Sequence, residues 1–500
     1  MNKTIALRPI TVAVLALMLA ACGGGGIDGD EAGTAPAPVP EPARPQDSRT
    51  FTAGAAAMAT TFAAMTAAPG DTVDMATTSR YAGTLDGAVY QIEVPANWNG
   101  KLVMYAHGFR GNDVPLTVNG PSIRRHLIQQ GYAWAASSYS RNYYDVRAGV
   151  EDTNKLANNF NAITTAAGRT LAAPTRIYIT GHSMGGHITG AAIEAEAAAT
   201  AVNKVAYHGA VPMCGVMGDA ELFNQFAAVQ MSAQALAGLP KYPSANWADI
   251  SAQVTGTLFA SFPTVAAPTT PITATATGQK FVSVLQNITG GPRPLFAQGL
   301  LFGGSFPLMW GALGGDGTIT GILNQSILDT TAFTYKIDGD EAGSTALNAA
   351  ALKLTAVPDA NRLRRDGLRW IPQINGEIKI PVVSIHTLGD LFVPFSMQQV
   401  YQKRVAAKGN SQWLVQRAIR GASHCDFTVA EQVEAFEAMV KWERDGIKPS
   451  GDDVVTAATV AAPTYGCTYT IDTLGLDDGG TTRALRAGIA QSLPGACAAP

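Results

Sequence analysis

The sequence predicts an α/β protein with a mostly parallel central sheet flanked by helices. Short β-branched and apolar runs alternate with longer helical stretches between residues 83 and 211, an order typical of parallel strands joined by helical crossovers. This alternation stops over residues 215–376 and resumes at 380–385, which favours an insertion into one sheet domain. A second, independent domain at 215–376 is the alternative.

The expected elements follow from hydrophobic period and run length. Strands are expected at 88–94, 101–106, 132–139, 176–180, 204–211, 380–385 and 413–419, and helices at 123–130, 146–167, 188–200 and 429–445. Residues 51–80 are rich in Ala, Thr and Met without a clear period, so no element is predicted there.

Residues 176–187 carry the motif around which the rest is organised. A short buried strand runs into Gly181-x-Ser183-x-Gly185, and an Ala-rich helical stretch follows. A serine on a tight strand-to-helix turn has a strained backbone, and small residues two positions away let neighbouring backbones approach. The hydroxyl then projects above the sheet at a helix N-terminus, which favours developing negative charge. We expect Ser183 to be a nucleophile; a helix-capping serine is the alternative.

This motif resembles the nucleophile turn of the α/β-hydrolase superfamily. His107-Gly108-Phe109, at the end of the strand expected at 101–106, resembles the oxyanion loop of the same superfamily. The resemblance implies an α/β-hydrolase fold and an oxyanion hole made by the backbone N–H groups of Phe109 and Met184. A simple strand-ending turn is the alternative at His107-Gly108.

The late part of the chain supplies an acid and a histidine. Asp390 follows the strand at 380–385 in a setting that resembles the superfamily's acid loop, although a glycine directly precedes the aspartate. Among seven histidines, His424 alone combines a loop position, a following helix and the chain order Ser…Asp…His. Asp426, next but one to His424, is the rival acid.

The N-terminus predicts export and a lipid anchor. Lys3 and Arg8 precede a short apolar run that ends in Leu19-Ala20-Ala21-Cys22, which resembles the bacterial lipobox. The resemblance implies a signal peptide at 1–21, a diacylated Cys22 and an outer-membrane lipoprotein of the bacterial cell envelope. Residues 22–50 are rich in Gly, Ala and Pro and predict a disordered tether. An ordinary secretory signal is the alternative.

The other four cysteines, an even number in an oxidising compartment, predict two disulfides. Cys425, beside His424, invites comparison with feruloyl esterases and tannases, in which a cysteine beside the nucleophile is bonded to one beside the histidine. His182 stands at that first position here, so the pattern is not met. Cys214 could still pair with Cys425. Cys467 and Cys497 would then pair within a C-terminal extension at 448–500, which we expect to be β-rich.

The composition is that of a secreted globular enzyme. Hydrophobic residues make up 47% and charged ones 15%, so a large core can be buried, and a net charge of −3 gives no case for nucleic-acid binding. No Cys-x-x-Cys pair or histidine cluster at ligand spacing indicates a metal, and no cofactor is expected.

These observations predict a lipid-anchored serine hydrolase that cleaves small-molecule or polymeric carboxylic esters through an acyl-enzyme. Ser183 is the expected nucleophile, His424 the base and Asp390 the acid. An amidase or peptidase with the same triad is the first alternative, and a non-catalytic binding lipoprotein is the second.

The expected domain organisation has four folded parts. The hydrolase core occupies 51–214 and 377–447, with a lid or cap insertion at 215–376 between the two segments and the small extension at the end. We expect the insertion to roof an apolar substrate site with side chains around 302–310, such as Phe306 and Trp310.

Overall fold

The computed structural model describes residues 50–54, 59–111, 113–240, 247–264, 267, 269–315, 326–357, 371–495 and 497. The predicted signal peptide, Cys22 and the tether up to residue 49 lie outside these described residues. All of the described residues belong to one compact unit.

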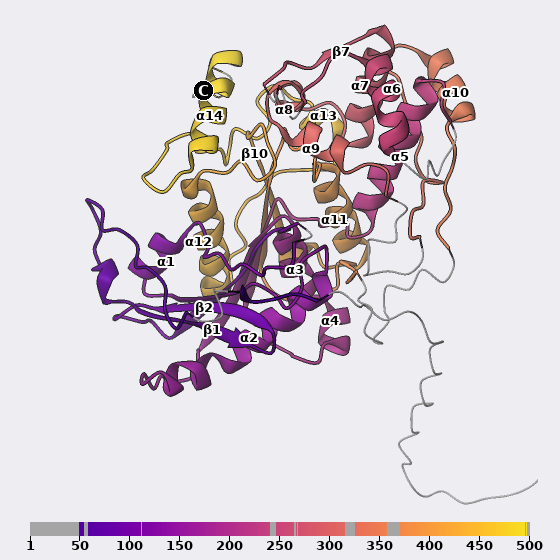
Figure 1. The fold of residues 1–500 in the computed structure, drawn as a ribbon. Coiled ribbons are helices and arrows are strands. Elements are labelled where there is room, and N and C mark those ends of the chain that lie inside the picture. Colours follow the sequence, from indigo (N-terminus) through magenta and orange to yellow (C-terminus); the bar gives the residue numbers. More distant parts are fainter. Residues whose placement is uncertain are drawn as a thin grey trace, which may run out of the picture. The chain divides into compact units, whose positions relative to one another are not determined.

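A sheet of eight strands forms the centre of this unit (Figure 1). In spatial order the strands are β1 (Ser79–Leu85), β2 (Ala88–Val94), β4 (Ala133–Ser137), β3 (Lys101–Ala106), β5 (Arg176–His182), β6 (Gly209–Met213), β9 (Val382–Thr387) and β10 (Leu414–Ile419). β2 pairs antiparallel with β1 and with β4, whereas the six strands from β4 to β10 are parallel. The predicted fold class is confirmed to this extent: the sheet is mostly parallel and is flanked by helices.

Helices cover both faces because side chains alternate along each strand. The helices around the sheet are α1 (Arg124–Gln129), α2 (Val146–Ala166), α3 (Met184–Ala192), α4 (Ala195–Thr200), α11 (Ser396–Ala407) and α12 (Val429–Asp445). On β3, Leu102 and Met104 pack on the face covered by α2, α3 and α11, whereas Val103 and Tyr105 pack on the face covered by α1 and α12. Short 3₁₀ helices occupy Met75–Thr77 and Ser411–Trp413.

The insertion between β6 and β9 is mainly helical and has a core of its own. Its elements are α5 (Glu221–Leu236), α6 (Trp247–Leu258), β7 (Phe259–Ser261), β8 (Thr273–Ala274), α7 (Ala276–Ile288), α8 (Phe296–Leu301), α9 (Ser305–Gly311) and α10 (Glu341–Ala350). Phe259, Phe281, Phe306 and Trp310 pack together in this core. In Figure 1 most of these helices gather in one group, coloured magenta to orange.

Four expectations about elements were wrong or incomplete. The helix expected at 188–200 is two helices, α3 and α4, and the strand expected at 204–211 is β6, which begins only at Gly209. β1 begins at Ser79, within the stretch 51–80 for which no element was expected. The C-terminal extension is helical in its described part, with α13 (Ala457–Val460) and α14 (Gly480–Ser492), rather than β-rich. Among the described residues, no helix combines the length and apolar character needed to cross a bilayer.

The topology brings two of the predicted site segments together at the carboxyl ends of the central strands. The chain passes from β3 to β4 on one side and then to β5 on the other, so the direction of winding reverses between β3 and β5. In open α/β sheets, ligands bind outside the carboxyl ends of strands at such a reversal. His107 follows β3 and Ser183 follows β5, so both lie at this point.

Candidate active site

Ser183 lies on a strained turn between β5 and α3. Its backbone has φ 59° and ψ −121°, which few non-glycine residues adopt. A Cβ at Gly185 would lie 2.0 Å from the carbonyl oxygen of Ala106, and one at Gly181 would lie 2.3 Å from the carbonyl oxygen of Gly185. Both glycines are therefore required by close backbone approach, which is what the motif predicted.

Three side chains from separate parts of the chain form a hydrogen-bonded series. His424 Nε2 lies 2.8 Å from Ser183 Oγ, and His424 Nδ1 lies 2.6 Å from Asp390 Oδ2. With the proton on Nδ1, the imidazole donates to the carboxylate and accepts from the hydroxyl. The backbone N–H groups of Phe392 and Val393 donate to Asp390 Oδ1 at 2.9 and 3.0 Å. Asp390 is fully buried, so these bonds fix the orientation of its carboxylate.

The rival acid Asp426 serves another part of the structure. Its Oδ2 accepts from the backbone N–H of Ala422 at 3.1 Å and lies 4.0 Å from Arg486 Nε. Burial raises the pKa of Asp426. Of the two carboxylates, the structure brings Asp390 to the imidazole.

The other histidines, all within the described residues, have partners elsewhere. Three of them are buried and His182 is half-buried. Loss of solvent around each ring lowers its pKa to about 4, so these four are neutral at pH 7: His107, His182, His187 and His386. His182, although next to Ser183, contacts the Tyr105 hydroxyl and Gln432 Oε1. None of the described histidines except His424 hydrogen-bonds to Ser183.

The loop after β3 passes against the serine. A Cβ at Gly108 would lie 3.2 Å from Ser183 Cβ, and Phe109 lines the same pocket as Ser183. His107 braces this loop, since its ring stacks on Tyr139 with centroids 4.2 Å apart and Tyr139 donates to the His107 carbonyl. Met184 is the first residue of α3, where a backbone N–H has no acceptor within the helix. The structure thus brings both expected oxyanion donors to the neighbourhood of Ser183.

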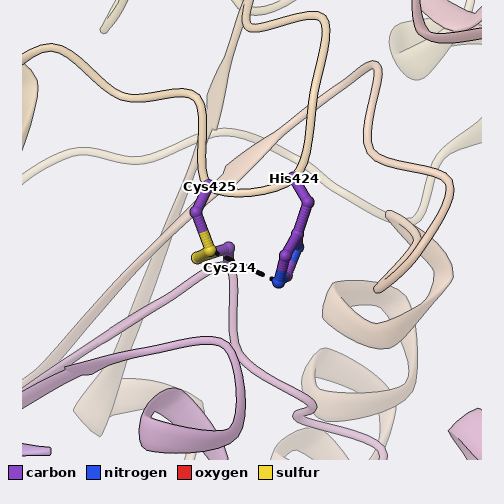
Figure 2. Close-up of side chains that lie close together, drawn as sticks. All are labelled: Cys214, His424 and Cys425. Atoms are coloured by element: carbon purple, nitrogen blue, oxygen red, sulfur yellow. Dashed lines mark hydrogen bonds between the residues drawn. A yellow bond between two sulfur atoms is a disulfide. The ribbon is translucent and has the colours of Figure 1, made fainter. Parts of the chain in front are cut away.

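A disulfide lies beside the imidazole. Cys214 is bonded to Cys425, and Cys425 Sγ lies 3.5 Å from His424 Nε2 (Figure 2). Metals bind thiolates, and both of these sulfurs are engaged with each other, so the group of Cys214, His424 and Cys425 is not a metal site in this state. A second disulfide joins Cys467 to Cys497. Both pairings are the ones considered from the sequence.

Ser183 opens onto an apolar cavity of about 300 Å³. Both the core and the insertion contribute to its wall, which includes Phe109, Tyr144, Phe223, Phe226, Leu313 and Phe392. No charged side chain lines it among the described residues. The rings form a row of contacts from Tyr144 through Phe223, Phe226 and Phe392 to His424, with successive centroids 5.1, 6.4, 5.8 and 5.5 Å apart.

The expected pocket residues of the insertion are corrected by the structure. Phe306 and Trp310 are buried in the insertion's own core and do not belong to the cavity wall. The insertion's part of the wall comes instead from α5, residues 312–315 and Leu328. On α5, Phe223 and Phe226 were not singled out from the sequence. Their i, i+3 spacing is the signal that could have found them.

Comparisons with known proteins give only distant similarity. No protein-family model matches the chain. A stretch of 75 residues, 15% of this chain, is 31% identical to o-phthalyl amidase from Xanthobacter agilis and covers 17% of that enzyme. The chain therefore spans far less than two thirds of the length of the curated relative that it matches.

Solved structures with a similar course of the chain include three hydrolases. Feruloyl esterase B from Aspergillus oryzae is 15% identical, with 74% of this chain and 81% of that chain covered and a TM-score of 0.38. Lipase A from Candida antarctica is 15% identical, with 83% of this chain and 84% of that chain covered and a TM-score of 0.34. Tannin acyl hydrolase from Aspergillus niger is 12% identical, with 74% of this chain and 79% of that chain covered and a TM-score of 0.39. These similarities are too low to carry an argument about function, so the site geometry carries it.

Proposed function

We propose that this chain is a serine hydrolase that cleaves carboxylic esters through an acyl-enzyme. The observation that carries the proposal is the hydrogen-bonded series Ser183–His424–Asp390 at an apolar cavity. Ser183 Oγ attacks the ester carbonyl carbon while His424 takes its proton, and Asp390 stabilises the imidazolium that forms. His424 then protonates the leaving alkoxide. Water enters, and the same base activates it to release the acid and regenerate Ser183.

The tetrahedral intermediate needs donors for its negative oxygen. In this proposal the backbone N–H groups of Phe109 and Met184 supply them, since both residues adjoin Ser183. One such donor typically contributes about 3–4 kcal/mol of transition-state stabilisation. Gly108 permits the approach, because any side chain there would press on Ser183.

The cavity indicates the kind of acyl group that fits. Its wall carries no charge among the described residues and is rich in aromatic rings, so an uncharged apolar group is favoured. A volume of about 300 Å³ is at the low end for ligand pockets, which favours a compact aromatic or short aliphatic acyl group over a long chain. The insertion, as a cap on this cavity, supplies part of the specificity through α5.

Amide hydrolysis is the second candidate. The short similarity to an amidase favours it, and the fold and triad serve both reactions. In that case His424 must protonate a leaving nitrogen rather than an alkoxide oxygen, which is a more demanding transfer.

Labelling by a fluorophosphonate tests the mechanism. The wild-type protein should be labelled on Ser183, and Ser183→Ala should escape labelling while keeping its fold by circular dichroism. A folded wild-type protein that resists the reagent contradicts the proposal. Matched ester and amide substrates with one acyl group then separate the two candidates: the larger kcat/KM identifies the reaction.

For the cellular setting, we propose export and anchoring of the protein to the bacterial envelope through a diacylated Cys22. The lipobox-like sequence supports this proposal. So do the two disulfides, because such bonds persist in oxidising compartments.

A further inference from the structure

The insertion contacts the loop that carries Asp390, which we call the acid loop (residues 387–394). The ring of Phe226 on α5 packs on Phe392. The hydrogen bonds and close backbone approaches to this loop come from one stretch of the insertion, residues 289–305, which joins α7 to the start of α9. This stretch does not line the cavity. Its contacts lie instead on either side of Asp390 in the sequence of the acid loop.

Before Asp390, the contact is made by a buried arginine. Arg293 is 7% exposed, and its Nε donates to the carbonyl oxygen of Leu388 at 2.8 Å. Its Nη1 donates to the carbonyl oxygen of Gly291 at 3.0 Å. Burial lowers the pKa of Arg293 to about 9, and attraction to the Asp390 carboxylate opposes that shift. The guanidinium is therefore charged at pH 7, with Asp390 as its electrostatic partner.

After Asp390, the contact is a buried hydroxyl. The backbone N–H of Leu391 donates to Ser305 Oγ at 3.0 Å, and both residues are buried. Between these two bonds the backbones touch directly: a Cβ at Gly299 would lie 2.1 Å from the carbonyl oxygen of Gly389. The acid loop is thus held by the insertion at 388, 389 and 391.

The same stretch reaches the histidine loop. A Cβ at Gly303 would lie 1.9 Å from the carbonyl oxygen of Ala422, two residues before His424. Glycine is therefore needed at 303 for the backbone to pass this close. Residues 289–305 contact both loops whose side chains form the Asp390–His424 hydrogen bond.

We propose that residues 289–305 are a positioning element for the acid and histidine of the triad, with Arg293 as its main positioning residue. Arg293 holds the acid loop through Leu388 and supplies a buried positive charge to the Asp390 anion. A buried carboxylate needs hydrogen bonds or a counter-charge to remain ionised. Small displacements of a catalytic group, of about 1 Å, can cost about 100-fold in rate. The inference rests on the proposed function, because the positioning element acts on the same proposed triad.

The contacts between residues 289–305 and the acid loop also limit how the insertion can move. Residues 289–305 cannot leave the acid loop without stranding the Leu388 carbonyl and the Leu391 N–H, two buried polar groups. Any opening of the cavity must therefore come from other parts of the insertion, such as α5.

The test compares Arg293→Met and Arg293→Lys with a matched control, Arg147→Met. Arg147 is also buried and donates to a backbone carbonyl, that of Thr200, but it lies on α2 away from the acid loop. Arg293→Met should lower kcat by about 10- to 100-fold with KM changed by less than about twofold. Arg293→Lys should recover part of kcat, because it keeps the charge. Arg147→Met should lower the melting temperature and leave kcat near the wild-type value.

A spectroscopic readout separates positioning from general destabilisation. The proton shared by His424 Nδ1 and Asp390 gives a far-downfield proton resonance when the pair is well aligned. This signal should shift or broaden in Arg293→Met and remain unchanged in Arg147→Met. Should Arg293→Met fail to fold, Ser305→Ala tests the same element without changing charge. Ser305→Ala should lower kcat several-fold at constant KM, and Ser305→Thr should restore it.

The outcomes are distinct. A folded Arg293→Met with wild-type kcat and an unchanged proton signal overturns the inference, and so does an effect confined to KM. Wild-type protein that is not labelled on Ser183 by a fluorophosphonate overturns the proposed function itself, whatever the variants do.

Discussion

Replacing Asp390 by Asn is the change whose result the structure specifies in most detail. Asp390 Oδ1 accepts two backbone N–H groups, from Phe392 and Val393, and Oδ2 accepts from His424 Nδ1. In Asp390→Asn the amide oxygen must occupy the place of Oδ1, where it can accept from the N–H groups of Phe392 and Val393. The opposite orientation would point an NH₂ group at two buried N–H donors, at about 1–3 kcal/mol for each lost bond.

The amide NH₂ therefore faces His424 Nδ1. The imidazole must accept there, so its proton moves to Nε2, the nitrogen that lies 2.8 Å from Ser183 Oγ. A protonated Nε2 cannot remove the serine proton. The expected loss is about 10⁴ in kcat, equivalent to about 5 kcal/mol of barrier. The shape and burial of the site are unchanged, so KM should move little.

The assay is steady-state hydrolysis of the best ester from the substrate panel, with circular dichroism and thermal unfolding to show that each variant folds. Asp426→Asn is the matched control, because that carboxylate is also buried and lies two residues from His424. Asp426→Asn should lower the melting temperature and leave kcat near the wild-type value. The reasoning is refuted if a folded Asp390→Asn keeps more than about a tenth of wild-type kcat, or if Asp426→Asn is the more damaging change.

The remaining predictions concern the cavity, the disulfide and the anchor. Phe226→Trp should raise KM for bulky esters more than for acetates, whereas Phe306→Ala should lower the free energy of unfolding by about 3–5 kcal/mol and leave that KM ratio unchanged. The double change Cys214→Ser and Cys425→Ser should lower kcat and also reduce the free energy of unfolding by about 2–5 kcal/mol, measured with denaturant. Cys22→Ser should release the protein from membrane fractions without changing activity on soluble esters; mass spectrometry that finds an unmodified N-terminus elsewhere in the wild type contradicts the anchor.

Local signals predicted the elements that carry the proposed triad. The helix expected at 429–445 has those bounds in the structure, and its start is marked by a capping box between Thr428 and Glu431. The turn at Ser183 follows from the glycine spacing, although the crowding that requires glycine at 181 and 185 comes partly from Ala106 on the neighbouring strand. Motif order selected His424 for the proposed triad, because it is the histidine that follows Asp390 in the chain and precedes a helix.

Tertiary packing decided what the sequence could not show. β1 is half-buried along nearly its whole length, so its side chains give no clear alternation. In the C-terminal extension, Arg486 donates hydrogen bonds to the Glu431 carboxylate and to the carbonyl oxygen of Asp426. No local sequence pattern predicts such a long-range contact. The apolar residues of the insertion divide between its own core and the cavity. Phe226 faces the cavity and Phe306 the insertion's own core, and this difference follows only from how α5 packs against the sheet domain.

The bond between Cys214 and Cys425 joins residues 211 positions apart and closes a ring of chain that contains the whole insertion. It ties the end of β6 to the residue next to His424. A chain synthesised in a reducing compartment lacks this covalent closure, so its histidine loop is fastened by weaker contacts alone. If the protein is exported as proposed, export is also a step of its maturation, because the bond between Cys214 and Cys425 forms and persists where thiols are oxidised.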